Sequence, residues 1–242
     1  MSDKLIDECQ KVIGYKFKDV NLLELSLTHS SYANENKQGH TKGKKPKDNE
    51  RLEFLGDAVL ELATSNNIFH TYPDMHEGKM SKYRASIVCE PTLAACAREF
   101  NLEKFLLLGK GEEAIGGRER DSIISDALEA LIGAIYLDGG MKNATKFIDQ
   151  FILNDIDDKR LFYDSKSSLQ EVIQAMGKEV VYTDIASEGP QHDKVFTVEA
   201  ETEGLFRIEA TGNTKKTAQQ NAAHKALVEL KKKGMFGTGK GK

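Results

Sequence analysis

The sequence lacks several features that mark common classes of protein. Its 242 residues contain no apolar run of about 18 residues or more, the length that a membrane-spanning helix requires. The first residues also lack the apolar segment of a signal peptide, so we expect a cytoplasmic protein with no membrane partner. Cys9, Cys89 and Cys96 form no CxxC pair, which argues against a disulfide framework or a zinc site.

Two further absences concern nucleic acids and nucleotides. The formal net charge is −4, so the chain has no overall basic excess. Phosphates respond to a local basic patch rather than to net charge, and nucleic-acid binding therefore stays open. The glycine-rich segment 107–120 lacks the GxxxxGK[ST] pattern of a phosphate-binding loop. We therefore expect no nucleotide cofactor.

Residues 49–62, NERLEFLGDAVLEL, predict a helix with an acidic face. At 100° per residue, its apolar side holds Leu52, Leu55, Val59 and Leu62. The roughly opposite side, within about 80° of arc, holds Glu50, Glu53, Asp57 and Glu61. Like charges four residues apart destabilise a helix, and Gly56 in its interior costs about 1 kcal/mol relative to alanine. We expect that the acidic face is used and that Gly56 lets a neighbour approach closely.

A second stretch, SIISDALEALIGAIYLD at 122–138, predicts a partner helix. Its apolar stripe consists of Leu128, Leu131, Ile132 and Ile135. Asp126 and Glu129 lie three residues apart on another face and precede a second mid-helix glycine, Gly133. Two helices that each present two carboxylates can build one oxygen-rich site for Mg²⁺ or Mn²⁺. For carboxylate spacing alone, the alternative is a solvated acidic stripe on an ordinary amphipathic helix.

Residues 164–233 predict a separate unit after a polar linker at 154–163. Helical patterns at 165–176 and 214–232 enclose three segments of β-type composition, 180–188, 194–202 and 206–211. The unit contains GPQH at 189–192 and NTKKTAQQNAA at 213–223. From residue 164 to residue 236 it has ten Lys and Arg against eleven Asp and Glu, so any phosphate contact depends on a small patch. The tail 234–242 is predicted to be disordered.

These motifs resemble those of a known family. NERLEFLGDAVL resembles the signature of the ribonuclease III family, and SDALEALIGAIYLD resembles its second acidic motif. The α-β-β-β-α order, with GPQH and the paired lysines, resembles a double-stranded RNA-binding domain. The resemblance spans residues 5–233. It implies an all-α nuclease domain at 5–153, followed by a small α+β RNA-binding domain at 164–233.

The resemblance also implies a reaction. A Mg²⁺-dependent endoribonuclease, in which Mn²⁺ can substitute, would cut double-stranded RNA to 5′-phosphate and 3′-hydroxyl ends with short 3′ overhangs. Processing of ribosomal RNA precursors and other RNAs is the expected task. By residue-to-residue match, Glu53, Asp126 and Glu129 are the principal metal ligands. Asp57 contacts the metal directly or through water and positions the attacking water. Whether one or two cations act at each phosphodiester is left open.

Partner contacts follow from the same resemblance. The chain has one nuclease motif set, so a two-fold symmetric homodimer is expected, with Glu50 and Arg51 near the subunit junction. Lys215 and Lys216 begin a helix and suit phosphates. Gln170, Gln174 and His192 suit the 2′-hydroxyls of a minor groove. The alternatives are surface solvation at the junction and incidental lysines in the small domain.

Two other functions compete with this reading. One is a non-catalytic double-stranded RNA-binding protein that keeps the nuclease fold as a dimer scaffold, although all four carboxylates are present. The other is a different all-α metal-dependent hydrolase of nucleotides, which the RNA-binding unit disfavours. The Gly/Lys-rich segment 36–48 is either a solvated loop or a basic arm near the RNA.

Overall fold

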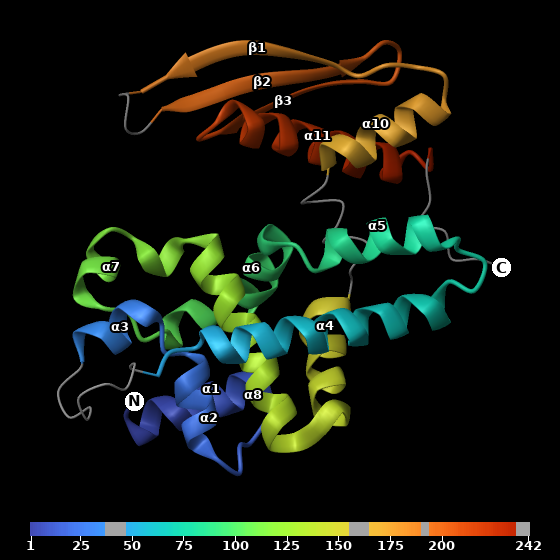
Figure 1. Cartoon of the computed structure of the whole chain (residues 1–242). Helices are drawn as coiled ribbons and strands as arrows, with labels where there is room; N and C mark the ends of the chain where they lie inside the picture. The colour runs from blue at the N-terminus through green and yellow to red at the C-terminus, as the bar shows by residue number, and fades with distance from the viewer. Residues whose placement is uncertain (37–46, 155–164, 190–193, 236–242) are drawn as a thin grey trace. The chain divides into compact units, whose positions relative to one another are not determined.

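The computed structural model describes residues 1–36, 47–154, 165–189 and 194–235, which belong to two compact units, Met1–Asn154 and Asp155–Lys242 (Figure 1). The predicted linker from residue 155 onwards and the predicted tail from residue 236 onwards lie outside the described residues. So does most of the Lys-rich segment 36–48. None of the helices in the described ranges is long and apolar enough to cross a membrane.

The first unit is built from helices. They are α1 (Asp3–Ile13), α2 (Val20–Ser26), α3 (Ser30–Glu35), α4 (Glu50–Thr71), α5 (Glu77–Ile87), α6 (Glu90–Glu99), η1 (Leu102–Phe105), α7 (Lys110–Ala114), η2 (Gly117–Glu119), α8 (Asp121–Ile148) and η3 (Asp149–Leu153). Among the described residues of this unit, extended pairing is limited to one parallel bridge between Thr28 and Leu107. The predicted all-α fold of this domain is therefore confirmed.

Helix α8 forms the centre of this unit. Its predicted apolar stripe is fully buried: Leu128, Leu131, Ile132 and Ile135 each have 0% of their surface exposed. Burying a side chain of this size contributes about 1.5–3 kcal/mol to folding. Helices α2, α4 and α6 pack against α8, and Figure 1 shows α4 crossing it. At Gly140 the helix kinks, because the backbone there takes a φ of 75°, which glycine adopts without steric cost.

Helix α4 has two apolar faces rather than the single one that the sequence predicted. Leu52, Val59 and Leu60 are buried in the unit. Leu62 is 61% exposed and Phe54 is 81% exposed, so placing Leu62 on the buried side was wrong. Because α8 covers only one side of α4, apolar side chains on its other side remain uncovered in the single chain. A large exposed apolar group of this kind often marks an interaction surface.

The second unit has the predicted α-β-β-β-α order. Its elements are α10 (Ser165–Ala175), β1 (Val181–Glu188), β2 (Val195–Thr202), β3 (Phe206–Gly212) and α11 (Lys215–Lys232). The strands form an antiparallel sheet in the order β1-β2-β3, with a register shift in β1 between Asp184 and Ala186. Both helices cover one face of the sheet (Figure 1).

The core of the second unit lies between this sheet and its two helices. On the sheet it includes Ala200 and Phe206, and on the helices Leu169, Ile173 and Leu227. The predicted period of two in β2 is confirmed, because Ala200 lies in this core and Val198, two residues before it, is also buried. Glu199 points to the opposite face, where Arg207 covers it through two hydrogen bonds of 2.8 and 3.0 Å.

Candidate metal centre and nucleic-acid interface

The position of the acidic residues is set by the crossing of α4 and α8. A Cβ atom added to Gly56 would lie 1.7 Å from the carbonyl oxygen of Glu129. One added to Gly133 would lie 2.3 Å from the carbonyl oxygen of Leu52. No side chain fits at either point, so the two backbones touch directly. This confirms that Gly56 allows a close neighbour, and it identifies that neighbour as α8.

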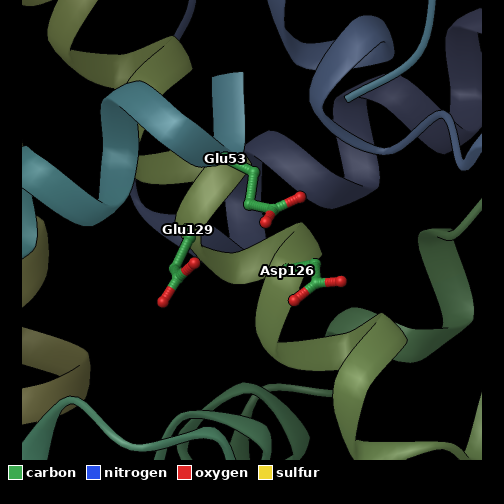
Figure 2. Close-up of side chains that lie close together, drawn as sticks. All are labelled: Glu53, Asp126 and Glu129. Carbon is green, nitrogen blue, oxygen red and sulfur yellow. The ribbon is translucent and has the colours of Figure 1, made fainter. Parts of the chain in front are cut away.

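Three carboxylates meet beside this crossing. Glu53 precedes Gly56 on α4 by about one turn, and Glu129 precedes Gly133 on α8 by about one turn. Asp126, three residues before Glu129, lies on the same side of α8. Single carboxylate oxygens of Glu53, Asp126 and Glu129 all lie within 4.8 Å of one another, and all three residues are half-buried. Figure 2 shows the three side chains extending into the same space from the two helices.

The electrostatics of this carboxylate cluster oppose full ionisation. Burial raises the pKa of Glu129 to about 8, and the charges of Asp57, Asp126 and Glu53 add to the rise. Burial and the neighbouring Asp126 also raise the pKa of Glu53. A divalent cation would compensate this repulsion, and carboxylate oxygens are the ligands that Mg²⁺ prefers. The donor set therefore fits the predicted metal.

Asp57, the fourth predicted ligand, is placed differently. It is exposed on α4 and is not one of the three residues whose oxygens come together. Its charge is nevertheless the largest electrostatic contribution to the raised pKa of Glu129, after burial. Asp57 follows Glu53 by four residues, about one turn or 6 Å along the helix axis. Its role at the metal stays a prediction.

Two residues outside the acidic motifs affect Asp126. After burial, the charge of Glu90 at the start of α6 raises the pKa of Asp126, while His29 lowers it. His29 caps α3, where its Nδ1 accepts a hydrogen bond of 3.3 Å from the backbone N–H of Ser31. Glu90 was not singled out in the sequence. No local pattern pointed to Glu90, because no charged residue lies three or four positions away from it. Its effect on Asp126 arises because α6 packs against α8 in the folded protein.

The predicted dimer-junction residues lie at a groove. Glu50 and Arg51 are exposed in the first turn of α4. They line a depression of about 590 Å³ together with Leu22, Leu25, Lys47, Asp48, Leu52, Leu55 and Leu137. Phe54, the most exposed large apolar residue in the described part of the chain, lies on the same helix.

The predicted RNA contacts in the second unit lie on its two helices. Gln170 and Gln174 are exposed and four residues apart, so they share one face of α10. Lys215 and Lys216 are exposed in the first turn of α11. The hydroxyl of Thr214 caps that helix by accepting a hydrogen bond of 3.0 Å from the N–H of Thr217. His192 lies outside the described residues.

A third lysine approaches the same helix. Gln219 on α11 accepts a hydrogen bond of 2.7 Å from the Nζ of Lys166 on α10. That Nζ also lies 5.0 Å from the ring centre of Tyr182. α10 therefore places a basic group beside α11. Sequence reasoning missed it because residues 166 and 219 are far apart along the chain.

Known proteins resemble both units. A family described as Ribonuclease-III-like matches residues 19–156, and the double-stranded RNA binding motif matches residues 165–230. Ribonuclease 3 of Listeria monocytogenes serotype 4b is 44% identical over 227 residues, which cover 93% of this chain and 97% of the relative. Ribonuclease 3 of Pelotomaculum thermopropionicum is 46% identical over 221 residues, which cover 90% of each.

A solved structure extends the comparison to the fold. The nuclease domain of ribonuclease III from Campylobacter jejuni is 43% identical and has a TM-score of 0.56. The match covers 62% of this chain and 96% of that domain. The description of that structure refers to a region involved in dimer formation.

Proposed function

This chain belongs to the ribonuclease III family and is a double-stranded-RNA-specific endoribonuclease, and we propose that it cuts RNA duplexes with Mg²⁺. The proposed products carry 5′-phosphate and 3′-hydroxyl ends with short 3′ overhangs. Precursors of ribosomal RNA are the proposed main substrates, and such a role locates the enzyme in the cytoplasm. Mn²⁺ is proposed as an effective substitute.

The observation that carries the proposal is the convergence of Glu53, Asp126 and Glu129 at the crossing of α4 and α8. These residues would hold the cation through their carboxylate oxygens. When bound there, Mg²⁺ would supply a nucleophilic water at neutral pH and would stabilise charge on the phosphoryl oxygens and the leaving 3′-oxygen. Asp57, exposed beside the cluster, would orient that water.

The second unit would hold the duplex for this reaction. A-form RNA presents 2′-hydroxyls in a wide minor groove, and amide side chains can both donate to them and accept from them. Gln170 and Gln174 project such amides from one face of α10. Lys215 and Lys216 would contact phosphates from the start of α11, where the helix dipole adds to their positive charge.

We also propose a two-fold symmetric homodimer, formed through α4. Phe54 is 81% exposed, and the groove, whose lining includes the adjacent Leu55, is lined by leucines from α2, α4 and α8. In a two-fold interface the same surface meets itself, so each Phe54 would enter the groove of the other copy. Glu50 and Arg51 line that groove and would then lie at the junction. Each site would cut one strand of the duplex.

The test compares the wild type with Glu129→Gln, which keeps the shape of the side chain and removes its charge. The matched control is Glu119→Gln, which removes an exposed carboxylate just before α8 and outside the cluster. Each protein is incubated with a long RNA duplex, a single-stranded RNA and Mg²⁺, and duplex binding is measured separately in chelator.

We expect the wild type and Glu119→Gln to cut only the duplex. Glu129→Gln should bind it but cut it more than about a hundredfold more slowly, since even residues that only support a metal ligand affect activity 10–100-fold. A wild type that binds duplex and never cuts with Mg²⁺ or Mn²⁺ would instead establish the scaffold function. End-labelling of the products tests the proposed 5′-phosphate and 3′ overhang.

A further inference from the structure

One of the two lysines proposed to bind phosphates is already engaged within the protein. The Nζ of Lys215 forms an ion pair with Oδ2 of Asp184 on β1. Both side chains are about half exposed, so the pair lies at the surface where an RNA phosphate would arrive. Within the described residues, the adjacent Lys216 has no ion pair. The two neighbouring lysines therefore differ in the free protein.

The position of Asp184 follows from the sheet. Asp184 lies opposite Val198 and two residues after Tyr182, which lies opposite Ala200. Val198 and Ala200 are buried under the helices, so Asp184 belongs to the helix-covered face of the edge strand β1. The register shift comes directly after it, and such bulges change the direction of side chains at sheet edges.

The position of Lys215 is also held from outside its own helix. A Cβ atom added to Gly212, at the end of β3, would lie 2.5 Å from the backbone nitrogen of Ala218, so α11 begins in direct contact with the strand. Asn221 donates a hydrogen bond of 2.8 Å to the carbonyl oxygen of Thr211. The first turns of α11 are thus attached to the sheet, and the ion pair with Asp184 needs no movement of the backbone.

We propose that Asp184 is an affinity-determining residue that competes with RNA phosphate for the ammonium group of Lys215. This inference rests on the proposed role of Lys215 in binding RNA. A carboxylate and a phosphate oxygen are both anionic acceptors for the same N–H donors. When a duplex binds, Lys215 must leave Asp184 or hold two anions that repel each other. Either way, part of the attraction to RNA is lost.

A different role for Asp184 is structural. A charged side chain on an edge strand discourages pairing with another chain. That role predicts that loss of the charge increases self-association and leaves the affinity for RNA unchanged. Competition predicts the opposite: tighter binding of RNA that depends on Lys215.

The experiment measures binding of the full chain to a short fluorescent RNA duplex by anisotropy, in chelator so that no cutting occurs. The variants are Asp184→Asn, Lys215→Gln, the double variant, and Lys216→Gln. The matched control is Glu229→Gln, because Glu229 near the end of α11 forms an exposed pair at 2.6 Å with Lys233, the residue that follows the helix. It lies about 21 Å from Lys215 along the axis, and its substitution changes the net charge equally.

We expect Asp184→Asn to bind the duplex about two- to five-fold more tightly, the range that an exposed ion pair supports. Glu229→Gln should bind like the wild type. Lys215→Gln should weaken binding, and adding Asp184→Asn to it should give no further gain. Thermal unfolding and sedimentation of each variant report on the structural role.

Two results would overturn the inference in different ways. If Lys215→Gln weakens binding but Asp184→Asn does not tighten it, the competition is absent while the RNA-binding role of Lys215 stands. If neither Lys215→Gln nor Lys216→Gln weakens binding, the proposed RNA contact at α11 fails, and the inference fails with it. A gain from Asp184→Asn that persists without Lys215 would also refute competition.

Discussion

Removing the charge of Glu129 should stabilise the metal-free protein at high pH. Burial and three nearby carboxylates raise the pKa of this residue from 4.5 to about 8. Between these two values, folded Glu129 keeps a proton that the unfolded chain has released. The free energy of unfolding of the wild type therefore falls as the pH rises across this window. Glutamine does not titrate, so Glu129→Gln lacks this loss.

The size of the effect follows from the shift. Each pKa unit corresponds to about 1.4 kcal/mol, so the full rise sets an upper bound of roughly 5 kcal/mol. The side chain retains some contact with water, and we therefore expect about 2–3 kcal/mol at pH 9. For a chain of this length, that difference raises the melting temperature by about 4–12 °C. Near pH 4.5 most of the advantage should be lost, since folded Glu129 is then protonated and only about half of the unfolded chains have released the proton.

Scanning calorimetry of the full chain in chelator, from pH 5 to pH 9, measures this difference. The relevant unfolding transition is the one whose midpoint temperature rises when Mg²⁺ is added to the wild type. Added Mg²⁺ should reverse the order at pH 8, because the wild type then gains a ligand that the variant binds weakly. The control Glu119→Gln should melt like the wild type throughout. A Glu129→Gln protein that gains nothing at pH 9, or gains equally at pH 5, would refute the assignment of buried, repelling carboxylates.

Three further outcomes test other parts of the structure. Gly56→Ala should lower the free energy of unfolding by more than about 3 kcal/mol by chemical denaturation, because its Cβ would overlap the backbone of α8. Gly78→Ala, in open space on α5, should be neutral or stabilising by up to about 0.5 kcal/mol. Phe54→Glu should convert the proposed dimer to a monomer in sedimentation velocity, whereas Ile115→Glu, at an exposed apolar site outside the groove, should not. Lys216→Gln should weaken duplex binding. It should also reduce the slope of log Kd against the logarithm of the salt concentration by about one unit.

Local patterns accounted well for the elements that carry the site. The segments predicted as strands at 180–188, 194–202 and 206–211 correspond to β1, β2 and β3 within one residue at each end. The buried stripe of α8 follows the predicted helical spacing. The strands follow from the β-type composition of their segments, and the buried stripe follows from the helical spacing of apolar residues. Each is a property of one contiguous segment.

The exposed face of α4 shows where this reasoning fails. Apolar residues occupy more of the circumference of α4 than one buried side requires. A prediction from helical spacing alone therefore placed Leu62 on the buried side, although it is exposed. A second apolar face on a helix often marks a contact with another molecule. The spacing of apolar residues does not show which of the two faces packs within the same chain. The contact with α8 decided this, because the glycines at 56 and 133 are the points where the two backbones fit together.

The sequence alone was enough to identify the family and to select the candidate carboxylates. The order of the motifs, the acidic residue types and their helical spacing are all features of contiguous segments. Tertiary structure alone decided how closely the oxygens of Glu53, Asp126 and Glu129 approach one another, and that Glu90 and His29 act on Asp126. It also paired Lys215 with Asp184 and Lys166 with Gln219. These contacts join residues distant in sequence, and their distances are set by how helices and strands pack rather than by any local pattern.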